Sequence, residues 1–444
     1  MKTRIETFLK NLPDWYIAVF FLMFTFILRA AWALFHYYSF PLPETNLYYE
    51  LAQEIIAQGR ILYDTSHPYY EFPGPLLPWL NALTMLFFGQ NYLGLYLVTA
   101  LGSALITFYT YKTARLFMNK TVSILSGIWS AIYLFYFYYT PAPGKDIWMA
   151  FFMIFLIHEL LKMFMLKQFS WKRYLVFILM FVMSFHLDER FFIFSPFLFF
   201  YILYHETEKF KVFRWQKSLT LVLLTMLLMV PWTIRNYQKH EKIVLISTRT
   251  EAFTDKIFGY EPRGHMMDDY NDIFGVYYIH ENQFDSIIKG FKTHTDGGFR
   301  IPDYQIDAMK NNHFPKPLTG FRAFSSRTLT MLEPLQLFPR YERTGYFYYM
   351  KSLRHNLATF LFYGLMFIFS VPGLVALFKK NRAISIVFIS IVALWVVIHG
   401  LAIPYTNWRY RLPLDSIFII CGCLGVWETI KIAGICKFPS HKEK

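Results

Sequence analysis

Three charged residues, Asp188, Glu189 and Arg190, stand side by side in the run from Tyr174 to Tyr204, which is otherwise apolar apart from one histidine and two serines. One charged side chain at the centre of a bilayer costs about 2.5–3.5 kcal/mol on insertion scales. Carboxylates can accept a proton from an attacking hydroxyl group, and arginine can bind a phosphate through two parallel hydrogen bonds. The triplet is therefore predicted to line a polar cavity open to the outside, and the alternative is a short turn closed by a local ion pair.

Other carboxylates and cations stand at or near the ends of apolar runs, and the topology derived below places them on one side of the membrane. A group of this kind suits an enzyme pocket at the membrane interface better than a pore, whose charges tend to line an axis. Each also has a structural alternative, because helix dipoles favour acids at helix starts and basic side chains anchor span ends. The group comprises Glu44, Glu50, Glu71, Lys145, Asp146, Arg235, Arg409 and Arg411, while Arg29, inside the first apolar run, is either a pocket residue or a buried partner for a carboxylate.

The chain shows no machinery for a soluble nucleotide or a firmly predicted cofactor. It contains no G-x-x-x-x-G-K-[ST] segment and no G-x-G-x-x-G after a strand. The segment "HMMDDYND" (265–272) could bind a divalent cation, although solvated acidic loops are far commoner. The three cysteines, Cys421, Cys423 and Cys436, predict neither a disulfide nor a metal site. If the protein transfers a group outside the cell, we expect the donor of that group to be carried by a lipid, as a sugar on a polyprenyl phosphate.

The composition identifies the class of protein that must position these residues. Of the 444 residues, 55% are hydrophobic and only 17% are charged, against roughly 25% charged residues in soluble domains. Apolar runs long enough to cross a bilayer, about 20 residues, recur along the chain. The sequence predicts an all-α polytopic membrane protein with about 10–12 transmembrane helices. The spans are predicted at about 15–38, 92–111, 121–140, 147–166, 174–187, 191–204, 218–234, 356–378, 383–402 and 414–433.

The charge distribution predicts the orientation of these spans. With the N-terminus in the cytoplasm, the short inner segments hold 21 Lys/Arg against 5 Asp/Glu, and the short outer segments hold 5 against 9. This asymmetry follows the positive-inside rule. The net charge of +14 therefore indicates a membrane surface rather than nucleic acid as the partner. The site is predicted to face the periplasm or the outside of a plasma (inner) membrane.

Several segments are predicted not to be ordinary spans. Residues 174–187 and 191–204 are 14 residues each, too short to cross about 30 Å, and would bury the charged triplet between them. In the first outer loop, 40–91, apolar residues at helical spacing predict a helix ending at Gly59, followed by an interfacial helix over 73–89. The aromatic run "YLFYFYY" (133–139) is predicted to face lipid or the interface.

Three parts of the chain are predicted from these features. Residues 1–234 form an N-terminal membrane domain that includes the first outer loop, 40–91. Residues 235–355 have the composition of a soluble extracytoplasmic domain with mixed short helices and loops. Residues 356–444 supply the last transmembrane helices and a cytoplasmic tail.

Several segments also match a known pattern in order along the chain. They are an acid-x3-Tyr-x3-Ala at Glu44, Tyr48 and Ala52 followed by "PGPLLPWLNALTMLFFG", an acid entering a span at Asp146, Arg190 after an apolar half-helix, "VPWTIRNYQKHEKIVLIST" (230–248) and "RYRLPLDSIFII" (409–420). In these places the sequence resembles the polytopic GT-C glycosyltransferases, in the bacterial branch related to protein O-mannosyltransferases and the lipid A aminoarabinose transferase. It departs from them in having Glu44 where an aspartate is usual.

The resemblance implies an inverting glycosyltransferase that uses a polyprenyl-phosphate-linked sugar at the outer membrane face. The acceptor would be a glycan such as lipopolysaccharide, a lipid or a protein of the cell envelope. Glu44 and Asp146 are the implied catalytic residues, and the implied substrate-binding residues are Lys145, Asp188, Glu189, Arg190, Arg235, Arg409 and Arg411. The competing hypotheses are a transporter or flippase for a lipid-linked glycan, and a non-catalytic membrane component of envelope glycan assembly.

Overall fold

The structure is a computed structural model of the 444-residue chain. It describes residues 12–40, 46–59, 74–142, 144–210, 215–240, 243–246, 357–402 and 408–433, with a few positions between 324 and 334. The chain divides into two compact units, which are described separately. The first comprises Met1–Glu251, Met366–Leu394 and Leu412–Lys444, and the second comprises Ala252–Leu365 and Trp395–Arg411. The predicted boundaries at 234/235 and 355/356 stay predictions, since most of the segment between them lies outside the described residues.

The prediction of an all-α polytopic membrane fold is confirmed. In the part of the chain that the structure describes, seven helical stretches are long and apolar enough to cross a membrane. They are formed by α2 (Asp14–Ser39), α5 (Tyr92–Arg115), α8 (Asp146–Leu160) with the π-helix η2 (Leu161–Met165), α11 (Gln216–His240), η5 (Phe360–Gly364) with α18 (Leu365–Lys380), α19 (Arg382–Ala402), and η6 (Trp408–Arg411) with α20 (Leu412–Ile432). Four shorter helices, α6 (Lys120–Ile132), α7 (Leu134–Tyr139), α9 (Trp171–Leu187) and α10 (Phe194–Phe210), fill the remaining predicted spans.

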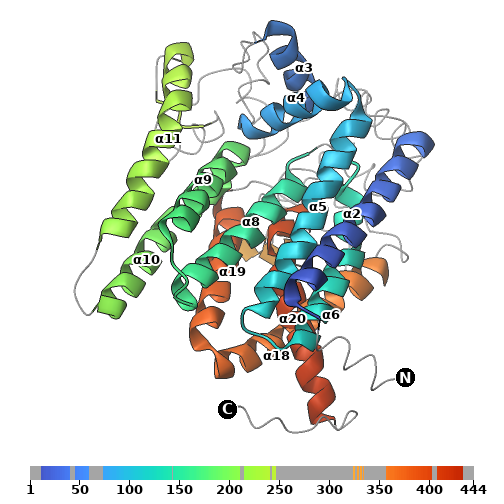
Figure 1. The fold of residues 1–444 in the computed structure, drawn as a ribbon, viewed down its shortest axis with the longest axis vertical. Helices are drawn as coiled ribbons and strands as arrows, with labels where there is room; N and C mark the ends of the chain where they lie inside the picture. Colours follow the sequence, from blue (N-terminus) through green and yellow to red (C-terminus); the bar gives the residue numbers. More distant parts are fainter. Residues whose placement is uncertain are drawn as a thin grey trace, which may run out of the picture. The chain divides into compact units, whose positions relative to one another are not determined.

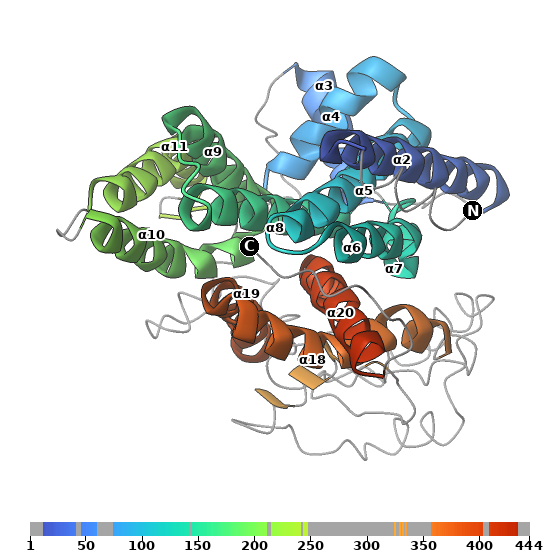
Figure 2. The ribbon, with the colours of Figure 1, turned by 60° about the horizontal axis from the view of Figure 1, so that its bottom comes forward.

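In the first unit, α5 and α8 form the centre of the bundle (Figures 1 and 2). Helix α2 packs along α5, and α20 packs against both α8 and α6. Helices α18 and α20 approach closely, because a Cβ on Gly373 would collide with the carbonyl of Cys421 and one on Gly425 with the carbonyl of Phe369. Small residues permit this kind of close approach between membrane helices.

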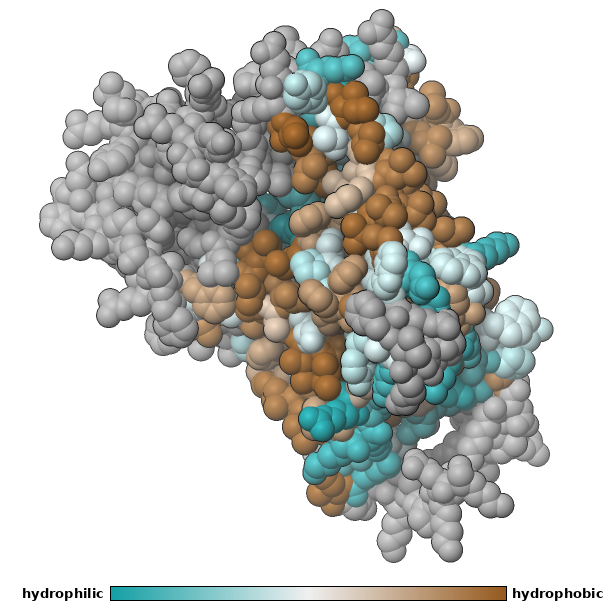
Figure 3. All heavy atoms as spheres, turned by 90° about the vertical axis from the view of Figure 1, so that its left-hand side faces the viewer, coloured by the Kyte–Doolittle hydropathy of each residue, from teal (hydrophilic) through white to brown (hydrophobic). Residues whose placement is uncertain are grey.

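The outward faces of these helices are suited to lipid. Helix α11 exposes large apolar side chains, among them Leu223, Met226 and Leu227. Apolar side chains cover the middle of the face shown in Figure 3, and hydrophilic ones gather towards its lower end. This is the surface that a bilayer-embedded bundle requires, since the hydrocarbon core tolerates few unsatisfied polar groups.

The helices on either side of the charged triplet are longer than predicted. Helices α9 and α10 have 17 residues each, rather than 14, and the 3₁₀-helix η3 (Glu189–Ile193) separates them. At 1.5 Å per residue each is about 26 Å long, close to the thickness of the hydrocarbon core. The predicted bounds, 174–187 and 191–204, are therefore corrected to 171–187 and 194–210, and the prediction that each helix is too short to cross the membrane stays a prediction.

The aromatic run over residues 133–139 is buried in part, which corrects the prediction that it faces lipid. Tyr133 and Tyr136 are 1% and 0% exposed, and only Tyr138 is largely exposed. Tyr133 interrupts the helix between α6 and α7, and its hydroxyl donates to Asp415 at 2.8 Å. Because a buried tyrosine needs a hydrogen-bond partner, this residue faces the interior.

Arg29 is fully buried and caps a helix end. It donates to the carbonyls of Ala131 (2.9 Å) and Tyr133 (3.3 Å) and lies over the ring of Phe137 at 3.4 Å. The last carbonyls of a helix lack intrahelical partners and attract cations. Arg29 therefore stabilises the C-terminus of α6, and no carboxylate pairs with it among the described residues.

The helix predicted to end at Gly59 and the apolar helix after it are both present at one end of the first unit (Figure 1). They are α3 (Leu47–Gln58), which ends at Gly59 in the left-handed conformation, and α4 (Leu76–Phe88). Helix α4 is too short to span and exposes Leu86 and Phe87 by 69% and 78%. This exposure agrees with a helix lying in the membrane interface.

Candidate functional site

Two cations from distant parts of the chain meet at one buried carboxylate in the first unit. Arg190 donates from Nε to Oδ1 of Asp188 at 2.6 Å and from Nη2 to Oδ2 at 2.7 Å. Lys145 forms an ion pair with the same Oδ2. The Asp188 side chain is 0% exposed, whereas Arg190 and Lys145 keep 7% and 13% exposure. We call these three residues the Asp188 cluster.

Local backbone geometry presents the Asp188 carboxylate to its partners. Helix α9 ends at Leu187, and Asp188 adopts an extended conformation with φ −157° and ψ 122°. Its side chain accepts a hydrogen bond from the Arg190 backbone N–H at 3.1 Å and so caps the 3₁₀-helix η3. The same carboxylate therefore fixes both the backbone and the guanidinium of Arg190, which makes the local ion pair part of a larger arrangement.

Helix α8 brings the second cation to the cluster. Lys145 immediately precedes α8, and Asp146 is its first residue, half-buried beside Lys145. An acid at a helix N-terminus is favoured by the helix dipole. Arg190 also reaches α8, where Nη2 lies 3.4 Å from the sulfur of Met149. The structure thus brings together three of the predicted site residues, Lys145, Asp188 and Arg190, and Asp146 follows Lys145 directly in the chain.

Electrostatics keep the Asp188 carboxylate charged. Burial by itself would raise the pKa of Asp188, but Arg190 and Lys145 together hold that pKa well below its usual range. Two cations share one carboxylate, so an anion arriving at their exposed sides would find positive charge already oriented. Asp188 itself is covered by its partners, and the prediction that it lines an open cavity is therefore wrong.

Aromatic side chains connect the cluster to the outer helices. A Cβ on Gly74 would collide with the backbone carbonyl of His186, so only glycine permits this contact between the start of α4 and the end of α9. The ring of Trp79 on α4 lies 6.2 Å from that of His186 and 5.7 Å from that of Trp232 on α11. The first outer loop is thereby held against the turn that carries the cluster.

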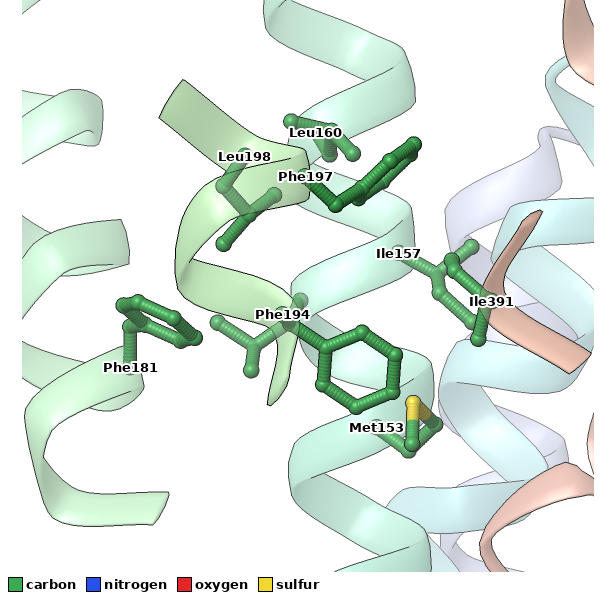
Figure 4. A pocket seen from close by; sticks show the side chains of 9 residues that line it. Met153, Ile157, Leu160, Phe181, Phe194, Phe197, Leu198 and Ile391 are labelled. Atoms are coloured by element: carbon green, nitrogen blue, oxygen red, sulfur yellow. The ribbon is translucent and has the colours of Figure 1, made fainter. Parts of the chain in front are cut away.

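An apolar pocket lies next to the cluster, further along α8 (Figure 4). Its cavity volume is small, about 20 Å³, and it is lined only by apolar side chains. Met153 lies one helical turn beyond Met149, and Phe194 lies four residues after Arg190. The lining residues come from α8, α9, α10 and α19 and are Met153, Leu156, Ile157, Leu160, Phe181, Phe194, Phe197, Leu198 and Ile391.

Arg235 has a structural environment at the end of α11. Its Nη1 donates to Oδ1 of Asn236 at 2.9 Å, and its guanidinium lies 4.9 Å from the Trp232 ring. Asn236 and Trp232 in turn donate to the carbonyls of Val244 and Ile246 at 2.9 and 2.7 Å. Trp232 and Asn236 of the "PWTIRNY" segment therefore hold the chain that follows α11 against the end of that helix.

The remaining predicted site residues are not brought to the cluster by any described contact. Glu189 is half-buried and forms no ion pair with the described residues. Arg409 and Arg411 belong to the second unit, where Arg411 is fully buried over the Tyr363 ring at 3.3 Å and Arg409 donates to the Tyr410 hydroxyl at 3.2 Å. Glu44, Glu71 and the acidic segment 265–272 lie outside the described residues. Within the described ranges, no group of histidine, cysteine and acidic side chains could hold a metal ion.

Asp415 is a buried acid that the sequence analysis did not select. It is 1% exposed in the first turn of α20 and accepts from the Tyr133 hydroxyl at 2.8 Å. The next residue, Ser416, lies within hydrogen-bonding distance of Thr110 and Tyr136. The sequence could have indicated Asp415, because an acid directly after "RYRLPL" lies inside an apolar run, where a charged residue is costly.

Comparisons with known proteins agree with this architecture. Residues 66–234 match the sequence model of a family described as dolichyl-phosphate-mannose-protein mannosyltransferase. No curated protein sequence matches the chain. The chain is similar to the Archaeoglobus fulgidus oligosaccharyltransferase in its apo form, with a TM-score of 0.56 and 13% identity over 96% of this chain and 51% of that one. It is also similar to the oligosaccharyltransferase AglB of that organism in complex with an inhibitory peptide and a dolichol-phosphate, with a TM-score of 0.53 and 14% identity over 96% and 51% of the two chains.

These similarities establish the fold. The chain spans about half the length of the archaeal proteins, and at this identity the shared feature is the backbone architecture. Together with the family match over 66–234, they confirm the resemblance to the GT-C superfamily of membrane glycosyltransferases. The chain has a GT-C-like fold.

Proposed function

We propose that this GT-C-like chain is an inverting glycosyltransferase that takes its sugar from a polyprenyl phosphate. The observation that carries the proposal is the Asp188 cluster, in which Lys145 and Arg190 share a single buried carboxylate. The cations keep one positive charge in excess within the cluster and retain partial exposure. Charge-assisted hydrogen bonds to phosphate are among the stronger polar contacts in proteins, and arginine makes them in pairs.

A lipid-linked donor fits the surroundings of the cluster better than a soluble one. The pocket beside it is apolar, and the helices around it have the composition of membrane spans. One of the structurally similar archaeal proteins is described in complex with a dolichol-phosphate. In our proposal the phosphate meets Lys145 and Arg190, and the prenyl chain extends towards the bilayer.

The acceptor would approach from the side of the first outer loop. Glu44 precedes α3 by three residues and is the proposed general base, with Asp146 at the start of α8 as the second candidate. A base removes the acceptor hydroxyl proton while the oxygen attacks the anomeric carbon, and the polyprenyl phosphate leaves with the electron pair of the broken bond. The cations of the cluster would stabilise the charge that develops on the leaving phosphate.

Purified protein in detergent should transfer label from a radiolabelled polyprenyl-phosphate sugar to envelope acceptors. Arg190→Ala is expected to lower kcat/KM for the donor by roughly 10–100-fold, since a charge-assisted contact is worth about 1.5–3 kcal/mol. Arg190→Lys keeps the charge but not the paired geometry and should be impaired less. Thermal unfolding must be followed alongside, because both changes disturb Asp188. A stable Arg190→Ala protein with unchanged donor kinetics would show that the triplet is only a structural turn.

The proposal also requires the cluster to face the outside of a plasma (inner) membrane. Single cysteines placed at Gly144 and Glu189 should react with a membrane-impermeant maleimide added outside intact cells, whereas a cysteine at Lys172 should react only after permeabilisation. The reason is the charge asymmetry of the loops, with 21 Lys/Arg against 5 Asp/Glu on the predicted inner side. Labelling in the reverse order would place the cluster in the cytoplasm and exclude an outer-face reaction.

A further inference from the structure

A second group of charged residues lies at the other end of α8, away from the Asp188 cluster. Glu159 is near the end of α8 and forms an ion pair with Arg173 of α9 at 3.1 Å. Lys112 of α5 and Lys162 of η2 lie close enough for their charges to act on Glu159 and Arg173. Along this helical stretch Lys162 lies 17 residues after Lys145, about 26 Å at 1.5 Å per residue, so this group is near the opposite end of the stretch from the Asp188 cluster.

The charges in this group are not balanced. The cations Lys112, Lys162 and Arg173 surround a single carboxylate, that of Glu159. This carboxylate already forms an ion pair with Arg173. Some of the other cations at this end of the first unit have acidic partners, as in the pairs Arg115–Asp14 at 3.0 Å and Lys217–Glu206 at 2.8 Å. Lys112 and Lys162 have no carboxylate within ion-pair distance in the described ranges.

The backbone around these residues is specialised. The α-helix gives way to a π-helix at Leu161–Met165, a form that occurs frequently at functional sites. Arg173 is anchored twice, since Nη1 also donates to the carbonyl of Gln168 at 2.7 Å. Behind Glu159 the ring of His158 is 1% exposed, and its Nε2 makes no hydrogen bond to the described residues. The group is thus partly buried, positively charged and incompletely hydrogen-bonded.

We propose that Lys112, Lys162 and Arg173 bind the phosphate of an anionic phospholipid headgroup in the leaflet opposite the Asp188 cluster. The three side chains come from α5, η2 and α9, so the phosphate would sit between helices where its acyl chains can enter the bilayer. Basic pockets between transmembrane helices on the cytoplasmic side bind such headgroups. This site does not depend on the proposed transferase activity.

The chain offers a matched control for general surface charge. Lys167, in the connection between η2 and α9, and Lys172, in the first turn of α9, are both exposed, whereas Lys112 and Lys162 are half-buried. A double change to glutamine removes the same charge in either pair. If Lys112 and Lys162 form a specific site, the two double variants should differ in how tightly they bind the lipid. If the lysines only attract an anionic surface, the two double variants should bind it equally.

The test measures binding of phosphatidylglycerol to the full chain in detergent by native mass spectrometry. Lys112→Gln/Lys162→Gln is expected to weaken binding about 25-fold, at about fivefold for each lysine, while Lys167→Gln/Lys172→Gln changes it less than about threefold. Phosphatidylcholine should not bind detectably, and inorganic phosphate should not compete at millimolar concentration. Equal losses in both double variants, or no loss in either, would overturn the proposal. Effective competition by inorganic phosphate would assign the site to a free anion and overturn the lipid source.

A folding control keeps the test decisive. If the glutamine pair does not survive purification, Lys112→Arg/Lys162→Arg should fold and bind the lipid within about threefold of the wild type, because both charges remain. In addition, phosphatidylglycerol should raise the thermal unfolding midpoint of the wild-type protein, since a ligand that binds the folded state stabilises it. Absence of that rise in the wild type and in the arginine pair would contradict the site.

Discussion

Asp188→Ala is expected to destabilise the protein by about 3–5 kcal/mol, the usual cost of removing one partner of a buried ion pair. The carboxylate is fully buried and accepts from Arg190 at 2.6 and 2.7 Å while it also pairs with Lys145. Without it, two cations remain packed together with no opposing charge. Thermal or mixed-micelle unfolding of the purified protein measures the loss, and glycosyl transfer should fall with it.

The neighbouring acid is the matched control for Asp188. Glu189 carries the same charge in the same turn, but it is half-buried and pairs with no cation among the described residues. Glu189→Ala should therefore change stability by less than about 0.5 kcal/mol. The double variant Asp188→Ala/Lys145→Met should recover part of the loss, because one of the two uncompensated charges is gone. Equal effects of Asp188→Ala and Glu189→Ala would contradict the importance of the ion pairs.

The difference in unfolding free energy between the wild type and Asp188→Ala should depend on pH in one direction. Arg190 and Lys145 hold the pKa of Asp188 in the folded protein well below its usual range, against the opposing effect of burial. The unfolded value is about 3.9. A carboxyl group whose pKa is lowered by folding stabilises the protein fully at any pH above its pKa in the unfolded chain. That stabilisation is lost as the pH falls through its pKa in the folded protein. The gap between wild type and Asp188→Ala should thus be constant from pH 8 to about pH 5 and shrink only in stronger acid.

The positions of the membrane helices could be predicted closely from the sequence. Hydropathy placed the first span at 15–38 and the last at 414–433, and the helices run over Asp14–Ser39 and Leu412–Ile432. Apolar length is a strong signal because the bilayer enforces it. The same signal cannot reveal which aromatic residues face the interior. Tyr133 was assigned to the lipid-facing surface because its partner, Asp415, lies 282 residues away along the chain.

The sequence placed the three residues of the Asp188 cluster among the candidates, but it did not indicate how they pair. The predicted topology placed Lys145 and Asp188 at the same end of the bundle, since each lies at the end of a span whose direction the loop charges predict. The structure covers Asp188 and leaves its two cations partly exposed. This arrangement depends on side-chain packing between α8 and α9, which no local pattern in the sequence encodes. Arg235 is a basic residue at a span end that donates to the neighbouring Asn236, and its predicted role at a substrate stays a prediction.

The largest effect on catalysis is expected at the first outer loop. Glu44→Gln should lower the rate of glycosyl transfer by about 10²–10⁴-fold while leaving the fold intact, because the amide is nearly isosteric but cannot accept the acceptor's proton. Glu44 itself lies outside the described residues, but the helix that follows it is anchored by a cap and by apolar packing. Asn46 caps α3 by accepting from the Tyr49 N–H at 3.1 Å, and Leu51 packs in one apolar cluster with Trp232.

A second acid on the same helix separates a catalytic loss from a general charge effect. Glu54 lies in α3 and accepts from Gln58 at 2.8 Å within that helix, so Glu54→Gln should keep nearly full activity. Rates must be measured with saturating donor and acceptor, since a base acts on kcat rather than on binding alone. If Glu44→Gln retains more than about a third of the wild-type rate, the proton acceptor lies elsewhere. Asp146, at the start of α8, is then the acid to test, because its half-buried carboxylate directly follows Lys145 in the chain and Asp146→Asn would remove it.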